Sequence, residues 1–338
     1  MIVRQHSGTG HNPFCFVVGC PRSGTTLLQR MLDHHPDLAV ANDTHFVPRA
    51  LEKTAPHLAD RAISGDPVPL TQALIDAVVG YRRFYRLGLD ERLGRELALK
   101  QDDYAGYSSA LYDRFAANEG KSLGGEKTPD YVRRLPLLFG LFPSTRVVHI
   151  IRDGRDVALS TLDWATASKG PGKLGLWNSE PLATCALWWR WQVLEGRGAG
   201  HMQSARYSEV RYAQLVEQPE LELQRLCEFL GLSMSSEMLA YHVGRTRTDR
   251  GSAKGNWLPP TSGLRDWRNQ MSQQDVALFE LLAGDLLEEL GFERAHYRTD
   301  SNIERRAVAC REWWSRFLER RERKRKRRSA RALTGVAP

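Results

Sequence analysis

The feature that most constrains the fold is a strand, a glycine-bearing loop and a helix that follow one another over residues 14–35. Phe14 to Val18 is a short, apolar, β-rich run ending at Gly19, which is typical of a buried parallel strand entering a turn. Thr25 to His35 has apolar residues at helical spacing, namely Leu27, Leu28, Met31 and Leu32. Such a loop can bind a phosphate through its backbone N–H groups and the N-terminus of the following helix.

A second strand-like run, Arg146 to Arg152, is almost continuously apolar, as a strand covered on both faces requires. It also leads into a turn and a helix. The further strand candidates are Leu38–Ala41 and Ala205–Tyr212, and the helix candidates are Leu70–Val79, Tyr104–Phe115, Leu182–Leu194, Pro219–Leu230 and Ser272–Leu290. Strands that alternate with helices predict an α/β fold, P-loop-like and three-layered, with a central, mostly parallel sheet flanked by helices.

Charge divides the chain into two parts. Of the net charge of +8, the segment 303–331 supplies 13 Lys and Arg against 4 Asp and Glu, whereas the rest of the chain has 35 against 36. We therefore expect residues 1–302 to form a single domain, with a helical insertion at about 46–120, and residues 303–338 to form a basic helix and tail. The body gives no support for nucleic-acid binding, and any contact with an anionic partner is expected through the tail.

The five cysteines are scattered, with no pair at metal-ligand or disulfide-framework spacing. Residues 1–13 lack an apolar segment, and no stretch approaches the roughly 18 apolar residues that span a bilayer. We expect reduced thiols and a cytoplasmic protein that is neither exported nor anchored in a membrane.

The loop from Gly19 to Thr26 carries the first set of candidate binding residues. Its specificity comes from the strand before it, the helix after it and the threonine pair, because two glycines at this spacing are common by chance. The loop differs from the P-loop of nucleotide triphosphatases: Thr25 stands where that motif has lysine, and the cation is instead Arg22. No Asp or Glu follows either apolar strand in a Mg²⁺-holding position, so a metal-dependent kinase lacks two of its parts, and we predict no metal site.

A second set follows the 146–152 strand. Arg152 ends the strand, and the hydroxyl of Ser160 lies two helical turns further on, so the two side chains can converge on one anion. Alone, this cluster would be better explained as solvated ion pairs. Two anion sites at the carboxyl ends of parallel strands, where open α/β sheets bind ligands, indicate a ligand with phosphates at two corners.

These motifs resemble those of sulfotransferases that use 3′-phosphoadenosine-5′-phosphosulfate (PAPS), and most closely those of tyrosylprotein sulfotransferases and their bacterial relatives. The similarity is strong over residues 14–50 and 124–164, weaker at 211–216, and absent in 51–120 and the tail. The matching residues are Pro21-Arg22-Ser23-Gly24-Thr25-Thr26-Leu27, Asp33-His34-His35-Pro36-Asp37, Thr44, Pro48-Arg49, and Arg152-Asp153-Gly154-Arg155 with Ser160.

The resemblance implies a role for each matched residue. Arg22 would lie near the sulfate and the leaving phosphate, and the 5′-phosphosulfate would be bound by Arg22, Ser23, Gly24, Thr25 and Thr26. Arg152 and Ser160 would bind the 3′-phosphate of PAPS and of its product, 3′-phosphoadenosine-5′-phosphate (PAP). Lys127 stands where relatives carry a lysine close to the transferring group, and Tyr212 at a position that lies against the nucleotide.

The position of the family's catalytic glutamate is occupied by Asp43, whose side chain is shorter. The candidate general base is therefore Asp43, with His45, two residues on, as its rival. A lone histidine is more often structural than catalytic. The sequence leaves the choice between the two open.

Several aromatic residues have a structural explanation. Trp188, Trp189 and Trp191, on one helix, are more typical of core packing than of a platform for an acceptor. Trp257 and Trp267 bracket a loop, with Lys254 and Arg265, that relatives close over the nucleotide.

The resemblance implies a direct in-line transfer of a sulfuryl group from PAPS to an acceptor hydroxyl, with a carboxylate as general base and without a metal. We expect the acceptor to be a small metabolite or natural product more than a protein tyrosine. The alternatives are a P-loop kinase of small molecules, and a non-catalytic adaptor that binds anions through its basic tail. We expect truncation after Asn302 to leave turnover intact unless Trp313 and Trp314 pack on the body.

Overall fold

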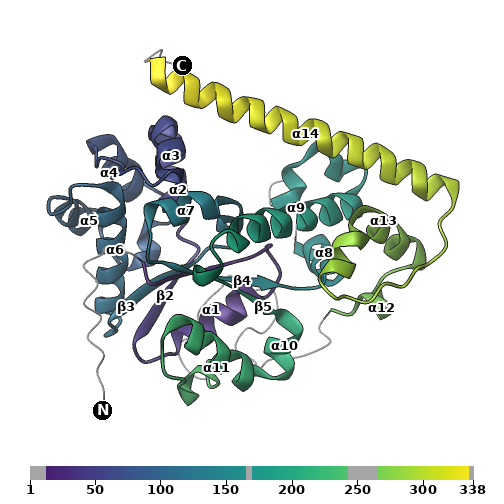
Figure 1. Ribbon diagram of the computed structural model, residues 1–338, viewed down its shortest axis with the longest axis horizontal. Coiled ribbons are helices and arrows are strands. Elements are labelled where there is room, and N and C mark those ends of the chain that lie inside the picture. Colours follow the sequence, from purple (N-terminus) through teal and green to yellow (C-terminus); the bar gives the residue numbers. More distant parts are fainter. Residues whose placement is uncertain (1–12, 165–169, 243–264, 335–338) are drawn as a thin grey trace.

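The computed structural model describes residues 13–164, 170–242 and 265–334 (Figure 1). Five strands form one sheet in the order β2-β3-β1-β4-β5, and every neighbouring pair is parallel. The strands are β1 (Cys15–Val18), β2 (Leu38–Asn42), β3 (Leu123–Lys127), β4 (Arg146–Ile151) and β5 (Tyr207–Arg211). Four of them were expected from the sequence, and β3 was not.

Helices cover both faces of the sheet, which confirms the predicted three-layer α/β fold. The longer ones are α1 (Thr25–Asp33), α2 (Phe46–Thr54), α3 (Pro56–Ile63), α4 (Gln72–Val79), α5 (Glu91–Ala98), α6 (Tyr104–Asn118), α7 (Leu135–Leu141), α8 (Gly154–Trp164), α9 (Pro181–His201), α10 (Tyr212–Glu217), α11 (Pro219–Leu230), α13 (Gln273–Glu289) and α14 (Ser301–Thr334). The short elements used below are η1 (Phe84–Leu87), η2 (Pro129–Arg134) and α12 (Trp267–Gln270). All five helix candidates of the sequence are present.

Alternation along β1 shows how the layers are held together. Phe16 and Val18 face one side of the sheet and pack in a core with residues of α6 and α7. Cys15 and Val17 face the other side and pack with residues of α1 and α11. All four side chains have no exposed surface, so β1 lies at the centre of the molecule with the loop at its carboxyl end fixed in place.

The strand that the sequence did not reveal, β3, has the sequence Leu-Gly-Gly-Glu-Lys and only one apolar residue. Its glycines are required by close packing. A Cβ atom on Gly124 would lie 2.3 Å from the carbonyl oxygen of Tyr112 in α6, and one on Gly125 would lie 2.7 Å from that of Cys15 in β1. Two backbones approach the strand too closely for side chains, so the residues that normally identify a strand are absent.

The chain's helical insertion, α2 to α6 with η1, lies beside the β2 and β3 edge (Figure 1). Three of its helices begin at a side chain that caps the first turn: Thr71 for α4, Asp90 for α5 and Asp103 for α6. Phe46 and Val47 of α2 have no exposed surface, so the insertion is joined to the main core.

The basic helix α14 runs along the outside of the molecule from α13, past α9, to α3 (Figure 1). Its first half belongs to the core, because Ile303, Ala307, Cys310 and Trp314 are buried. Further along, Arg325 and Ser329 bond the carboxylate of Asp60 in α3. Trp313 and Trp314 thus pack on the body, which was the stated exception to the expectation that truncation after Asn302 leaves turnover intact. Removal of the whole helix would remove core residues. The division of the chain at 302 and the anionic contact through the tail stay predictions.

Among the described residues, no helix is both long and apolar enough to cross a membrane. The cytoplasmic location expected from the sequence stays a prediction. Trp257 and Lys254 lie outside the described residues.

We predict that truncation after Asn302 abolishes soluble folded protein, whereas truncation after Leu318 does not. The first deletion removes several buried apolar side chains, each worth about 2–5 kcal/mol, from a fold whose total stability is on the order of 5–15 kcal/mol. The second keeps every one of them. Soluble yield and circular dichroism on heating provide the measurement, and a cooperative melt of the shorter chain near the full-length melting temperature would contradict the prediction.

Candidate active site

Each of the five parallel strands ends in a candidate residue from the sequence. Arg22 follows β1, Asp43 follows β2, Lys127 ends β3, Arg152 follows β4 and Tyr212 follows β5. Because the strands are parallel, their carboxyl ends lie at one edge of the sheet. The fold therefore gathers residues that are up to 190 positions apart in the chain.

The loop after β1 is a tight turn with two residues in the left-handed region. Gly24 has a φ of 95°, and a Cβ atom there would lie 2.4 Å from the ring of Tyr212, so only glycine fits. The backbone of Arg22 is, like that of Gly24, in the left-handed region, with a φ of 77°. The hydroxyl of Ser23 is buried, and the described residues offer it no hydrogen-bond partner. A buried donor without a partner is what an anion-binding loop provides.

Arg22 connects the two sequence motifs. Its Nε donates to the hydroxyl of Ser160 over 3.0 Å. Burial lowers the pKa of Arg22, and the positive charges of Arg152 and Arg265 lower it further. Three guanidinium groups thus share one small region, an arrangement that a bound anion would stabilise.

Arg152 contacts Tyr212 and Asp156. Its guanidinium lies 4.3 Å from the centre of the Tyr212 ring, and its Nη2 lies 3.5 Å from a carboxylate oxygen of Asp156. Burial raises the pKa of Asp156 to about 6. Arg152 Nε is buried and has no hydrogen-bond partner among the described residues, so it retains capacity to bind an anion.

Lys127 joins the β1 loop to the turn after β2. The side chain is only 2% exposed, and its Nζ lies 3.3 Å from Oδ1 of Asp43 and 3.5 Å from the hydroxyl of Thr26. A buried ammonium group needs such oxygen partners. Lys127 therefore lies between the loop after β1 and the candidate base Asp43, and its role in the reaction stays a prediction.

Two arginines that the sequence did not single out contact the Asp43 turn from the insertion. Nη1 of Arg83 donates to the carbonyl of Asp43 over 3.2 Å, and Nη1 of Arg86 donates to the carbonyl of Asn42 over 2.9 Å. The same nitrogens lie 4.0 Å and 3.8 Å from Oδ2 of Asp43. Both arginines come from residues 51–120, where the sequence showed no recognisable motif and isolated arginines are usually solvated, so no signal distinguished them.

The rival base, His45, lies in the same turn. Its Nε2 is 4.0 Å from Oδ1 of Asp43. Burial lowers the pKa of His45 to about 4, so the ring is neutral at pH 7 but only weakly basic. The structure thus brings both candidates to one place, and the histidine has no advantage in basicity over an ordinary carboxylate.

Two buried residues, Arg155 and Trp189, support the end of β4. Arg155 has no exposed surface and binds the carboxylates of Asp153 and Glu280. Its guanidinium also lies 3.6 Å from the centre of the Trp267 ring. Trp189 is fully buried, and its indole N–H donates to the carbonyl of Arg152 over 3.1 Å. Core packing, as expected for this aromatic helix, therefore also holds the end of β4.

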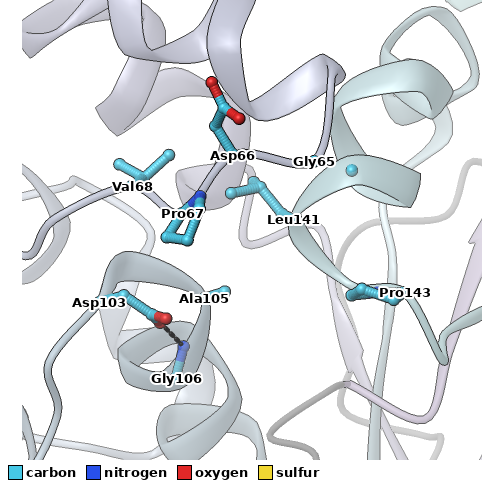
Figure 2. A pocket seen from close by; sticks show the side chains of 10 residues that line it. Gly65, Asp66, Pro67, Val68, Asp103, Ala105, Gly106, Leu141 and Pro143 are labelled. Carbon is cyan, nitrogen blue, oxygen red and sulfur yellow. Dashed lines mark hydrogen bonds between the residues drawn. The ribbon is translucent and has the colours of Figure 1, made fainter.

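A hollow of about 250 Å³ lies elsewhere in the molecule, and Figure 2 shows the residues that line it. It is lined by Gly65, Asp66, Pro67, Val68, Asp103, Ala105, Gly106, Gly140, Leu141 and Pro143. None of the candidate residues takes part in it. We therefore assign the chemistry to the strand ends and not to this hollow.

Comparison with known proteins identifies the family. The model of the sulfotransferase family matches residues 13–236, about two thirds of the chain. The chain belongs to the sulfotransferase family. The match covers all five strands and every candidate site residue, and it confirms the resemblance found in the motifs.

Among curated proteins, nodulation protein NoeE of Sinorhizobium fredii is 26% identical over 323 residues, which cover 90% of this chain and 72% of NoeE. Protein-tyrosine sulfotransferase A of Caenorhabditis elegans is 24% identical over 311 residues, which cover 85% of this chain and 70% of that protein. This sulfotransferase thus has relatives of both the bacterial and the tyrosylprotein type.

Solved structures show the same fold. The sulfotransferase domain of the Synechococcus PCC 7002 olefin synthase superimposes with a TM-score of 0.57 at 23% identity, and covers 85% of this chain and 97% of that domain. The sulfotransferase domain from the curacin biosynthetic pathway gives a TM-score of 0.52 at 18% identity, with 84% and 99% covered.

We predict that Gly24→Ala destabilises this sulfotransferase more than Gly120→Ala. Both glycines have a positive φ, of 95° and 71°, but nothing lies within 4 Å of a Cβ atom on Gly120. Gly120→Ala should reduce the free energy of unfolding by about 1–2 kcal/mol, from the left-handed backbone alone. Gly24→Ala adds a clash with Tyr212 worth a further 1–3 kcal/mol or so. Urea denaturation measures both, and equal losses would contradict the assigned packing of Tyr212 on the loop.

Proposed function

We propose that this sulfotransferase uses PAPS as donor and transfers its sulfuryl group to a hydroxyl of a small metabolite. The observation that carries the proposal is the group of buried cations and unpartnered donors at the carboxyl edge of the sheet, chiefly Arg22, Ser23 and Arg152. Such a set suits a ligand with several anionic groups. Family membership favours sulfuryl transfer over the phosphoryl transfer of a kinase.

The residues present fit PAPS. In the proposal, the β1 loop with Ser23, Gly24, Thr25 and Thr26 binds the 5′-phosphosulfate through N–H groups and hydroxyls. Arg152 and Ser160 bind the 3′-phosphate. The hydrogen bond from Arg22 to Ser160 links the proposed 5′-phosphosulfate and 3′-phosphate subsites, so the guanidinium of Arg22 lies near both anionic groups in the proposal. Tyr212 packs against Gly24 and the guanidinium of Arg152, and in the proposal it also contacts the nucleotide.

In the proposed mechanism, Asp43 accepts the proton of the acceptor hydroxyl as that oxygen attacks sulfur in line with the leaving phosphate. Arg22 and Lys127 stabilise the negative charge that develops on the bridging oxygen. The bond from oxygen to sulfur forms as the bond from sulfur to the phosphate oxygen breaks, and PAP leaves as an anion held by the same cations. His45 can take the proton in place of Asp43. We place Asp43 first because it occupies the position of the family's catalytic carboxylate, and because burial leaves His45 no more basic than an ordinary carboxylate.

In the proposal, the insertion forms part of the acceptor side, in a segment where the sequence showed no tyrosylprotein-type motif. Arg83 and Arg86 reach the Asp43 turn from the insertion, in a region with no counterpart in the family motifs. In the proposal, this arginine-lined turn receives an acceptor other than a protein tyrosine. The adaptor alternative, with binding through α14 and no turnover, is tested by the same measurements.

We predict that PAP raises the melting temperature without Mg²⁺, and that ATP with Mg²⁺ raises it far less. Arg152→Ala should weaken PAP binding by about 2 kcal/mol or more, because a charge-assisted fork of hydrogen bonds is lost. Arg22→Ala should mainly reduce turnover, since its charge acts on the transition state. Thermal-shift titrations and single-turnover rates separate the two effects.

A larger shift with ATP and Mg²⁺ than with PAP would favour the kinase. Equal losses of PAP affinity in the two arginine variants, with no difference in rate, would contradict the division of roles between Arg22 and Arg152. Lys173→Ala removes one positive charge at an exposed residue outside the proposed site residues, and provides a control for the loss of charge alone.

We predict that Asp43→Asn reduces turnover by about a hundredfold or more while PAP affinity changes little. Asparagine is nearly isosteric but cannot take up the proton. Asp43→Glu restores the residue usual in relatives and should keep part of the activity. Turnover of the acceptor, followed by mass spectrometry, and the PAP thermal shift are the two measurements. If Asp43→Asn stays active while His45→Ala is inactive, the base is the histidine.

A further inference from the structure

Glu126, next to Lys127 at the end of β3, is a fully buried acidic residue outside the family motifs. Neighbouring side chains of a strand point to opposite faces, so Glu126 points away from Lys127. A carboxylate that is removed from water must be stabilised by hydrogen bonds or by an opposite charge. Its hydrogen bonds show which part of the site it holds.

Five donors converge on this carboxylate. Tyr112 of α6 donates to Oε2. Burial and the charge of Glu126 raise the pKa of Tyr112 well above its ordinary value, so the phenol keeps its proton and donates. The four donors to Oε1 are the N–H of Thr44 at 2.9 Å, the hydroxyl of Thr44 at 2.6 Å, the N–H of His45 at 3.2 Å and the hydroxyl of Thr128.

The turn that Glu126 holds has an unfavourable backbone. Asp43 and His45, on either side of Thr44, have φ values of 56° and 64°, in the left-handed region that residues with a Cβ atom rarely adopt. Such a conformation persists only where the surroundings determine it. Two consecutive N–H groups directed at one carboxylate oxygen fix the orientation of this turn.

We infer that Glu126 is a positioning residue: its carboxylate holds the turn of residues 43–45 in the conformation that places the carboxylate of Asp43 beside the ammonium group of Lys127. The inference rests on the proposed sulfuryl transfer, in which Asp43 and Lys127 act at one centre. The distance of 3.3 Å between Asp43 Oδ1 and Lys127 Nζ depends on this turn. Arg83 and Arg86 bind the same turn from the insertion side, so Glu126 fixes it from the sheet side.

Three variants test the inference. Glu126→Asp keeps the charge but is too short to reach both Tyr112 and the turn, and an error of about 1 Å in placing Asp43 reduces rate by on the order of a hundredfold. We expect kcat to fall by about that factor, with the KM for PAPS within about threefold. Glu126→Gln keeps an oxygen facing the turn and should retain kcat within about tenfold. Tyr112→Phe removes the donor to Oε2 of Glu126, the oxygen that does not face the turn. It should lower the melting temperature about as much as Glu126→Asp does, but reduce kcat far less.

Hydrogen exchange of the amides of Thr44 and His45 gives a measurement that does not depend on turnover. Both amides should exchange faster in Glu126→Asp than in the wild type, and at the wild-type rate in Glu126→Gln. Full activity of Glu126→Asp would overturn the inference, as would a loss of kcat that tracks the loss of melting temperature across all three variants. If the wild type binds PAP but transfers no sulfuryl group, the proposed function fails while the exchange rates still decide the role of Glu126.

Discussion

The parallel pairing of all five strands is the constraint on which the site depends. β1 pairs with β3 on one side and with β4 on the other, and its carboxyl end therefore opens between two other strand ends. Burial of both faces of β1 fixes that edge, since Phe16 and Val17 pack into different cores. Helices and loops that diverge from this edge leave room for a ligand, as in other open α/β sheets.

The electrostatics of this edge then determine what it can bind. Arg22, Arg152 and Lys127 are largely removed from water, and burial lowers the pKa of Arg22. Oxygen partners from Ser160, Asp156 and Asp43 stabilise them only in part, and a ligand with two phosphates would complete the arrangement. The carboxylate of Asp43 lies 3.3 Å from the ammonium group of Lys127 at this same edge.

Sequence alone could predict the elements that follow strong periodic or motif signals. β1, β4 and the long helices have continuous or helically spaced apolar residues, and the β1 loop has a recognisable motif. It could not predict β3, because Gly124 and Gly125 are required by neighbouring backbones and carry no hydrophobic pattern. Glu126, Arg83 and Arg86 were missed for a related reason: each acts on the Asp43 turn through contacts that are distant in sequence. The sequence pointed to Trp313 and Trp314 as residues of the basic helix that could pack on the body, but whether they do depends on contacts with α9 and α13 that only the structure shows.

The central claim is that the five strand ends form one sulfuryl-transfer site. Mass spectrometry after incubation of the wild type with PAPS and a metabolite extract of the producing cell tests it most directly. The account predicts an acceptor whose mass increases by one sulfuryl group, at a rate greatly reduced in Arg22→Ala. Formation of no sulfated product, or of the same product at an equal rate by Arg22→Ala, would contradict it.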